Sequence, residues 1–134
     1  MTVLVVDDES SYRMLLRDFL MGEGFEVLTA ENGDEALRKL MVIQPEIIIS
    51  DVYMPVMDGR KLHRAVRQMA RYERLPFLFV SGYDDAYTQQ AQQDPRYDAF
   101  VRKGGAMREL KETIARLTTP EDKRDNPGKV ARVF

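Results

Sequence analysis

Three short runs of the chain are almost entirely apolar, and this feature restricts the fold more than any other. They read VLVV at residues 3–6, EIIIS at 46–50 and FLFV at 77–80. Strands that face solvent on one side alternate apolar and polar residues, whereas strands buried on both faces are apolar throughout. The three runs therefore indicate a parallel sheet with helices packed on both of its faces.

Two weaker runs complete a set of five predicted strands, and stretches between and after them have helical periodicity. The fourth such stretch, DDAYTQQAQQ at 84–93, has little apolar face, so we expect a short and mobile helix there. The predicted strands are Val3–Val6, Phe25–Thr29, Glu46–Ser50, Pro76–Val80 and Ala99–Val101. The apolar stripes of the other four predicted helices are Met14, Leu15 and Phe19; Ala36, Leu37, Leu40 and Met41; Leu62, Ala65, Val66 and Met69; and Met107, Leu110, Ile114 and Leu117.

Polar residues next to these stripes predict where helices begin. We expect Ser10 or Ser11 to cap the first helix and Asp58 to cap the third. The segment NGDEA at 32–36 is typical of a turn that leads into the second helix.

Strict alternation of strands and helices predicts the fold class. It indicates an α/β fold, a doubly wound (βα)5 three-layer sandwich around a five-stranded parallel sheet. In such folds ligands bind beyond the carboxyl ends of the strands. The pattern stops after Leu117, so we interpret residues 1–117 as one domain and residues 118–134 as a C-terminal tail or the start of a linker.

Composition excludes several classes of protein. The 134 residues carry a net charge of −2, which gives no basic field for direct nucleic acid binding. The chain has no cysteine, which excludes disulfides and thiolate metal sites. No basic segment followed by an apolar one stands at the N-terminus, and the apolar runs are far too short to cross a membrane. We therefore expect a cytoplasmic protein without membrane contact.

Polar residues follow four of the five predicted strands, at the edge where ligands bind in this fold. They are Asp7 and Asp8, Asp51, Ser81 and Lys103. Carboxylates brought together repel one another unless a cation joins them, and oxygen ligands without His or Cys favour magnesium. At least one carboxylate should therefore have a raised pKa without the metal. A carboxylate can also be a nucleophile, so Asp51 could form an aspartyl phosphate, with lysine and hydroxyl donors for the phosphate oxygens.

On these residues the chain resembles the receiver domain of two-component response regulators, the CheY-like superfamily. The resemblance covers roughly residues 2–117. Its segments are VLVVDDES, EIIISDVYMPVMDG, FLFVSG and DAFVRK, and DVYMPVMDG is the most specific of them. The resemblance implies a flavodoxin-like strand order, 2-1-3-4-5.

The resemblance also implies a role for each acidic residue. Asp51 matches the aspartate that accepts the phosphoryl group. Asp8 matches the direct ligand of Mg²⁺ or Mn²⁺, and Asp7 matches the acid that acts mostly through water. The backbone carbonyl of Tyr53 would complete the protein ligands.

Four further positions match the family's switch. Ser81 matches the hydroxyl that turns toward the phosphoryl group, and Lys103 matches the lysine that binds phosphate. Phe100 matches the switch aromatic residue, although it could be an ordinary core aromatic. Tyr53 and Tyr83 border the site, where they would lengthen the life of the phosphorylated form, or their rings simply lie on the surface. We interpret His63, which has no metal-ligand companions, as a surface residue.

One position departs from the family pattern. The family has a proline after the lysine, usually with a cis bond, whereas this chain reads RKGGAM at 102–107. A cis bond before a residue other than proline costs about 3 kcal/mol, so we expect a trans Lys103–Gly104 bond. Freedom of the backbone at Gly104 and Gly105 would aim the lysine instead.

The resemblance implies a signalling switch, not an enzyme with a substrate of its own: a phosphoacceptor that assists its own phosphorylation and dephosphorylation. Its partners would be a sensor histidine kinase or histidine phosphotransfer protein, and a downstream protein or output domain. Phosphorylation would change the surface of the fourth helix, fifth strand and fifth helix, where a phosphorylation-dependent homodimer could form. The chain could be a stand-alone receiver or the N-terminal piece of a longer transcriptional or enzymatic regulator.

Two other functions fit the sequence less well. A magnesium-dependent phosphatase with an aspartate nucleophile, like the haloacid-dehalogenase-like enzymes, needs a second acid two residues after the nucleophile, where this chain has Tyr53. A degenerate receiver that only binds proteins would not need the full set of acids, serine and lysine.

Overall fold

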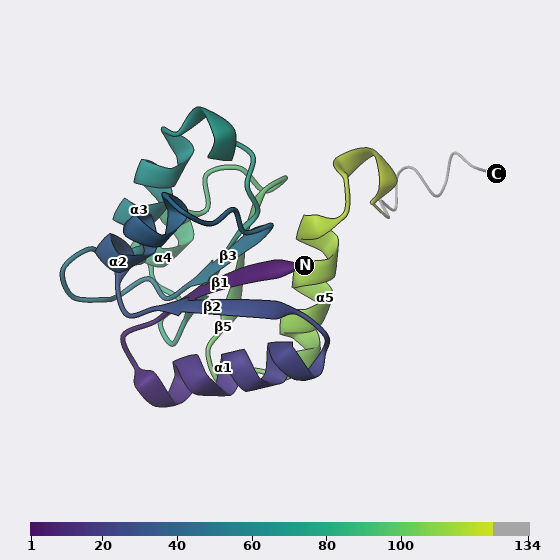
Figure 1. Cartoon of the computed structure of the whole chain (residues 1–134), viewed down its shortest axis with the longest axis horizontal. Helices are drawn as coiled ribbons and strands as arrows, with labels where there is room; N and C mark the ends of the chain where they lie inside the picture. Colours follow the sequence, from purple (N-terminus) through teal and green to yellow (C-terminus); the bar gives the residue numbers. More distant parts are fainter. Residues whose placement is uncertain (125–134) are drawn as a thin grey trace.

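Five parallel strands form a single sheet in the computed structural model, which describes residues 1–124 (Figure 1). Its order is β2-β1-β3-β4-β5, the order implied by the family resemblance. Each predicted strand lies within one residue of the observed one at both ends. The strands are β1 (Thr2–Val6), β2 (Glu26–Ala30), β3 (Ile47–Ser50), β4 (Phe77–Ser81) and β5 (Asp98–Arg102).

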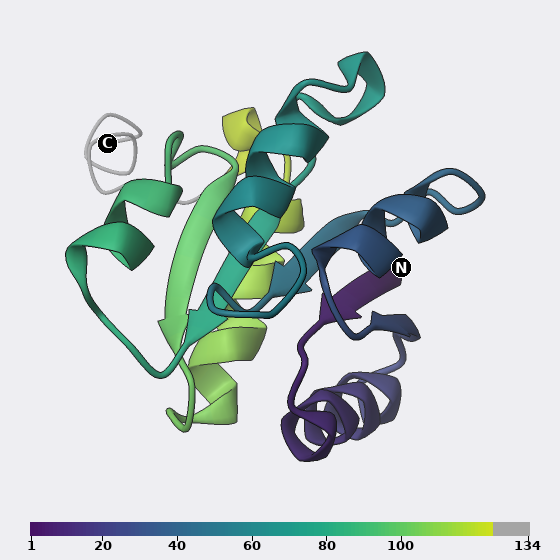
Figure 2. The same cartoon turned by 90° about the vertical axis from the view of Figure 1, so that its left-hand side faces the viewer.

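Helices cover both faces of the sheet, which confirms the three-layer sandwich (Figures 1 and 2). Side chains of α1 and α5 pack on one face, and those of α2, α3 and α4 pack on the other. The fourth helix has only 6 residues, as its weak apolar face predicted. The helices are α1 (Ser10–Gly22), α2 (Gly33–Leu40), α3 (Gly59–Arg67), α4 (Ala86–Ala91) and α5 (Met107–Thr118), with short 3-10 helices η1 (Ala70–Tyr72) and η2 (Glu121–Lys123).

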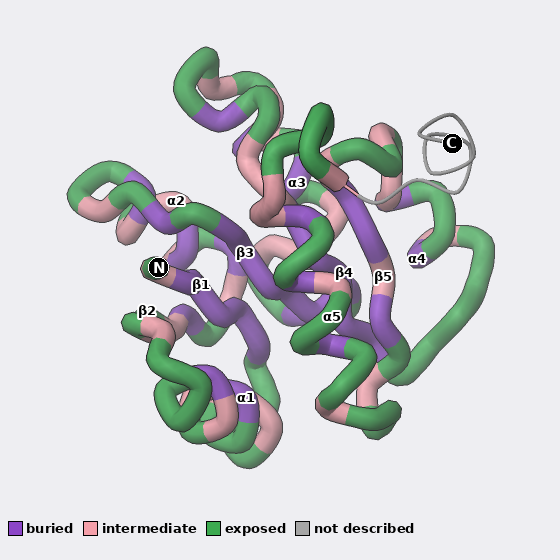
Figure 3. Tube along the Cα trace, turned by 90° about the vertical axis from the view of Figure 1, so that its right-hand side faces the viewer, coloured by how far each residue is buried: buried purple, intermediate pink, exposed green. Residues whose placement is uncertain are grey.

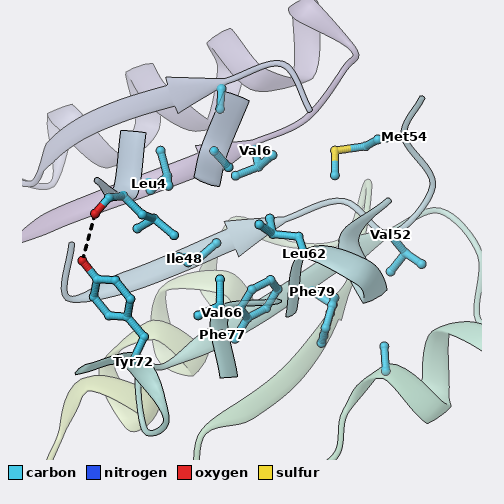
Figure 4. Packing of buried hydrophobic residues seen from close by; sticks show 14 residues of the cluster. Leu4, Val6, Ile48, Val52, Met54, Leu62, Val66, Tyr72, Phe77 and Phe79 are labelled. Atoms are coloured by element: carbon cyan, nitrogen blue, oxygen red, sulfur yellow. Dashed lines mark hydrogen bonds between the residues drawn. The ribbon is translucent and has the colours of Figure 1, made fainter. Parts of the chain in front are cut away.

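Strands β1, β3 and β4 are buried on both sides, as their near-continuous apolar sequence requires (Figure 3). In β1, Val3 and Val5 face the layer of α1 and α5, whereas Leu4 and Val6 face the other layer. Figure 4 shows that second cluster, in which the Tyr72 hydroxyl donates a hydrogen bond of 3.5 Å to the Leu40 carbonyl. Alternate side chains of one strand thus fill two separate cores.

The predicted apolar stripe of the first helix is partly wrong. Met14 and Leu15 are 50% and 51% exposed, whereas Leu16 and Leu20 are buried. Helical residues advance about 100° each, so the face that carries Leu16 and Leu20 turns Met14 and Leu15 toward solvent. Met41 is also exposed, because it lies beyond the end of α2.

The helix caps agree with the sequence in two of three cases. Asn32 and Asp58 cap α2 and α3, each with a side-chain oxygen that accepts a backbone N–H at 2.8 Å. The expected serine cap of α1 is wrong: Glu9 precedes the helix, no side-chain cap bond forms there, and Ser10 is the first helical residue. The Asp7 carboxylate instead accepts the backbone N–H of Glu9, at 2.9 Å, just before the helix.

His63 is not a surface residue, which corrects the prediction from sequence. It is only 1% exposed, and its ring packs against Phe77 with 4.9 Å between ring centres. Its Nε2 lies 2.9 Å from Asp98 Oδ1, and Arg67 donates to the same oxygen at 2.5 Å. A buried carboxylate from β5 therefore supplies the polar partner that burial of an imidazole needs.

The C-terminal part of the structure continues past the predicted domain end. Helix α5 ends at Thr118, and the Arg124 guanidinium donates to the backbone carbonyls of Arg96 and Leu117. Residues 125–134 of the predicted tail lie outside the described residues. Within residues 1–124, each helix is too short or too polar to cross a membrane.

Candidate functional site

Three carboxylates meet at the carboxyl edge of the sheet. Asp7 and Asp8 follow β1, Asp51 follows β3, and these two strands are neighbours. Each residue offers one oxygen, and these oxygens all lie within 4.8 Å of one another. Asp7 and Asp51 are buried, whereas Asp8 is exposed. The cluster therefore has two fixed carboxylates and one open to solvent.

The backbone holds the buried pair in place. The Asp51 N–H donates to the Val6 carbonyl at 2.9 Å, and the Asp7 N–H donates to the Ala30 carbonyl at 3.1 Å. Both bonds extend the sheet pairing past the strand ends. A Cβ at Gly59 would stand 2.0 Å from the Asp51 carbonyl oxygen. Only glycine therefore allows α3 to begin directly against Asp51.

Lys103 joins the two buried carboxylates. Its ammonium nitrogen lies 2.9 Å from Asp7 Oδ2 and 3.0 Å from Asp51 Oδ2. Burial by itself would lower the pKa of Lys103, but the hydrogen bonds to Asp7 and Asp51 outweigh burial and raise it to about 12. The lysine is therefore fully charged at neutral pH and offsets part of the negative charge.

Asp7 has the raised pKa expected for a carboxylate of this cluster. Burial is the largest cause of the increase in pKa, and repulsion by Asp51 is a smaller cause in the same direction. Hydrogen bonds from the Lys103 side chain and the Glu9 N–H lower the pKa but do not cancel the increase. The direction confirms the prediction, but the main cause is desolvation and not like charge. A cation at this site would relieve both.

A tight turn follows Lys103 where the family has its proline. The Gly105 N–H donates to the Arg102 carbonyl at 3.1 Å, and Gly104 has φ +87°. Lys103 keeps a negative φ, so the turn is type II with glycine at the position that requires positive φ. The Lys103–Gly104 bond is trans, as predicted.

The two predicted switch residues lie on β4 and β5, which follow β3 in the order of the sheet. Ser81 is fully buried at the end of β4, and its hydroxyl oxygen accepts the Tyr83 N–H at 3.1 Å. Phe100 lies opposite Phe79 in the β4–β5 pairing and is half-buried against the cluster of α2, α3 and α4. Ser81 and Phe100 therefore lie on adjacent strands, but their switching roles stay predictions.

A pocket of 560 Å³ opens above the acids. Tyr53 and Tyr83 line it and are 40% and 65% exposed, so both rings lie at the surface. Their ring centres are 5.4 Å apart in an edge-to-face arrangement. The complete lining is Asp8, Glu9, Asp51, Tyr53, Gly82, Tyr83 and Lys103.

Two tyrosines fasten the loop after Asp51 to α4, a contact that sequence reasoning missed. The Tyr53 hydroxyl donates to Asp85, which caps α4, and the Tyr87 hydroxyl donates to Asp58, which caps α3, at 2.6 Å. The two rings stack with centres 5.7 Å apart. We call these four residues the tyrosine clasp. The one available signal was the aspartate before each helix, since a capping carboxylate has a second oxygen free for a donor.

The model of the response regulator receiver domain matches residues 3–115. Response regulator MprA of Mycolicibacterium vanbaalenii is 33% identical over 90% of this chain and 52% of its own length. Vibrio cholerae chemotaxis protein CheY4 has a TM-score of 0.80 at 34% identity, over 87% of this chain and 97% of that one. Thermotoga maritima response regulator TrrA, solved with Mg²⁺ and BeF, has a TM-score of 0.74 at 32% identity, with the same coverage.

The relatives differ greatly in length. The chain spans about half of MprA, and among other curated relatives the share runs from 13% to 79%. The match therefore says nothing of what these longer proteins do as a whole. The matched part itself spans the sheet, all three acids, and Lys103. The fold, the strand order and this match together show that the chain belongs to the response regulator receiver domains of two-component systems.

Proposed function

We propose that this domain accepts a phosphoryl group on Asp51 and thereby switches a protein-binding surface. The observation that carries the proposal is the position of Lys103, whose ammonium bridges the buried carboxylates of Asp7 and Asp51 at 2.9 and 3.0 Å. A structural salt bridge needs one acid. A lysine between two acids, with a third beside them, is suited to a reaction that adds negative charge at Asp51.

The donor set fits a divalent cation with oxygen ligands. Asp7, Asp8 and Asp51 supply three carboxylates without histidine or cysteine, which favours Mg²⁺ or Mn²⁺. Asp8, the exposed member, would bind directly, and Asp7, held by Lys103 and the Glu9 N–H, would act mostly through water. The backbone carbonyl of Tyr53 would complete the protein ligands. When bound, the cation neutralises charge on the transferred phosphoryl group.

Phosphoryl transfer uses a carboxylate oxygen of Asp51 as nucleophile. The donor is a phosphohistidine of a sensor kinase or phosphotransfer protein. An O–P bond forms at Asp51 as the P–N bond of the donor breaks, and the imidazole leaves with the electron pair. Lys103 and the Ser81 hydroxyl donate to the phosphoryl oxygens. The same groups support hydrolysis by water, so the domain assists both its phosphorylation and its dephosphorylation.

The change of the binding surface begins with movement of the Ser81 hydroxyl. When its hydroxyl leaves the Tyr83 N–H for the phosphoryl group, the half-buried ring of Phe100 can enter the vacated volume. This movement shifts the population of the surface formed by α4, β5 and α5. A downstream protein, an output domain or a second copy of the domain then binds there. Tyr53 and Tyr83, at the pocket mouth, restrict water and lengthen the phosphorylated state.

The phosphatase alternative has less support. Such enzymes protonate the leaving group with an acid two residues after the nucleophile. Here that residue is Tyr53, whose hydroxyl is engaged with Asp85 and whose pKa is raised chiefly by that hydrogen bond. It is therefore a poor proton donor to a leaving group.

Intact-mass spectrometry after treatment with acetyl phosphate and Mg²⁺ tests the proposal. We expect one added phosphoryl group in the wild type, none in Asp51→Asn, and none when the metal is removed with EDTA. Asp18→Asn, on the exposed side of α1, is the control and should react like the wild type. Full phosphorylation of Asp51→Asn would refute the assignment.

A further inference from the structure

The ring of Tyr12 lies against the ammonium of Lys103. The nitrogen is 4.6 Å from the ring centre, well within the range of a cation–π interaction. Asp7 and Asp51 contact the same nitrogen from other directions. The ammonium is thus surrounded by two close carboxylates, the more distant carboxylate of the exposed Glu9 at 3.9 Å, and one aromatic face, and the Lys103 side chain is only 15% exposed.

The backbone alone does not fix the direction of this lysine. Lys103 is the second residue of the turn Arg102–Gly105, and the two glycines that follow it carry no side chain that could restrain it. Lysine has four rotatable side-chain bonds and a compact charge that binds equally well from many directions. Two nearby carboxylates therefore attract the ammonium without deciding where between them it rests.

Tyr12, by contrast, stands on a rigid support. It lies in the first turn of α1, and its ring is half-buried against the core cluster shared by α1 and α5. Helix α1 is anchored in that cluster by Leu16 and Leu20, which are 1% and 0% exposed. The aromatic face is therefore held in place independently of the acids.

We propose that Tyr12 is a positioning residue for Lys103, and that its ring face holds the ammonium between Asp7 and Asp51. The role rests on the proposed phosphorylation of Asp51. The ring does not contact the phosphoryl donor. It limits the lysine to positions from which it reaches a phosphoryl oxygen on Asp51 without reorganising, and this raises the rate of transfer.

Two substitutions separate the ring from its hydroxyl and its volume. Tyr12→Phe keeps the aromatic face, while Tyr12→Leu fills similar space without one. The measurement is the rate of Asp51 phosphorylation by acetyl phosphate at saturating Mg²⁺. We expect Tyr12→Phe within about twofold of the wild type and Tyr12→Leu about 2- to 30-fold slower, the range that a cation–π contact supports. Magnesium affinity should not change, because all three carboxylates remain.

A double-mutant cycle distinguishes positioning from a structural role. In a Lys103→Ala background, Tyr12→Leu should cause no further loss of rate, because its effect passes through the lysine. An equal loss in both backgrounds would overturn the proposal, as would a Leu variant as fast as the wild type. A Phe variant as slow as the Leu variant would assign the effect to the hydroxyl instead. Urea unfolding verifies that each variant is folded, and Tyr12→Met replaces the Leu variant if that one is not.

The failure of the proposed function gives a different result. In that case the wild type gains no phosphoryl group on Asp51, whatever stands at position 12. The positioning role is then tested by NMR relaxation of the Lys103 side chain in the wild type and in Tyr12→Leu. Equal order of the side chain in both proteins would overturn it, and greater mobility without the ring would support it.

Discussion

The Tyr87 hydroxyl of α4 donates a 2.6 Å hydrogen bond to Asp58, the residue that caps α3. The same Asp58 binds the Lys61 N–H with its other oxygen, so one carboxylate serves both helices. A similar hydrogen bond runs in the opposite direction, because the Tyr53 hydroxyl donates to Asp85 at the start of α4. Helix α4 buries only Thr88 and Ala91, and these polar contacts therefore supply much of its attachment.

Removing one hydroxyl of the tyrosine clasp should loosen α4. We expect Tyr87→Phe to lower the free energy of unfolding by about 1 kcal/mol, the usual net value of a hydrogen bond, and to speed amide exchange in α4. Hydrogen exchange read by mass spectrometry measures the change. Tyr83→Phe is the control, since Tyr83 lies outside the clasp. Equal exchange in α4 for both variants would show that the bond does not hold the helix.

The buried Asp98 should make stability depend on acid pH. Burial would raise the pKa of Asp98, but the hydrogen bond and charge of His63, the Asp94 N–H and Arg67 outweigh burial and lower this pKa below the usual value of an aspartate. A carboxylate whose pKa is lower in the folded state stabilises the fold at every pH above its pKa in the unfolded state. This stability is lost as the pH falls through the pKa of the folded state. Asp98→Asn should cost about 3–5 kcal/mol at pH 7 and less at pH 3. Urea unfolding at several pH values measures this, with Asp18→Asn as control. A difference that does not shrink toward pH 3 would contradict the assignment.

Val56 has a strained backbone. Its φ is +70°, a conformation that costs a β-branched residue about 1–3 kcal/mol. Val56→Gly should therefore raise stability by about 1 kcal/mol after the entropic cost of glycine. Val42→Gly is the matched control, because Val42 is equally exposed, at 82% against 79%, without positive φ. The control should be neutral or destabilised. Destabilisation of both proteins in thermal unfolding would argue against strain.

Asp7 should destabilise the domain in the absence of metal. Its pKa is raised, chiefly by burial, so the folded state binds its proton more tightly and loses stability as pH rises through the folded pKa. Asp7→Asn should therefore raise metal-free stability at pH 7. It should also remove the gain from Mg²⁺, which for the wild type is about 2.7 kcal/mol at a concentration of 100 times Kd.

Thermal unfolding with and without Mg²⁺ tests both halves of this expectation. Asp18→Asn is the control, since it removes an exposed carboxylate of α1 that is not among the three acids of the cluster. Lower metal-free stability of Asp7→Asn would mean that its bond to Lys103 outweighs the cost of burial. An unchanged response to Mg²⁺ would remove Asp7 from the proposed metal site.

The sequence by itself determined the sheet and the edge at which the site lies. Apolar runs without alternation required strands buried on both faces, and parallel strands bring all their carboxyl ends to one edge. Asp7, Asp8, Asp51 and Lys103 follow strand ends, so their meeting was predictable from order along the chain. A fold of this kind leaves few other arrangements open.

Tertiary structure alone decided which partners the polar groups chose. His63 is buried because Asp98, on another element, accepts its hydrogen bond. The exposed face of α1 depended on how the helix is rotated about its own axis, which buries Leu16 and leaves Met14 and Leu15 exposed. Tyr12 beneath Lys103 and the tyrosine clasp join segments far apart in sequence. Periodicity and strand ends are local properties of a chain, whereas the partner of a buried charge or hydroxyl is set by packing between distant elements.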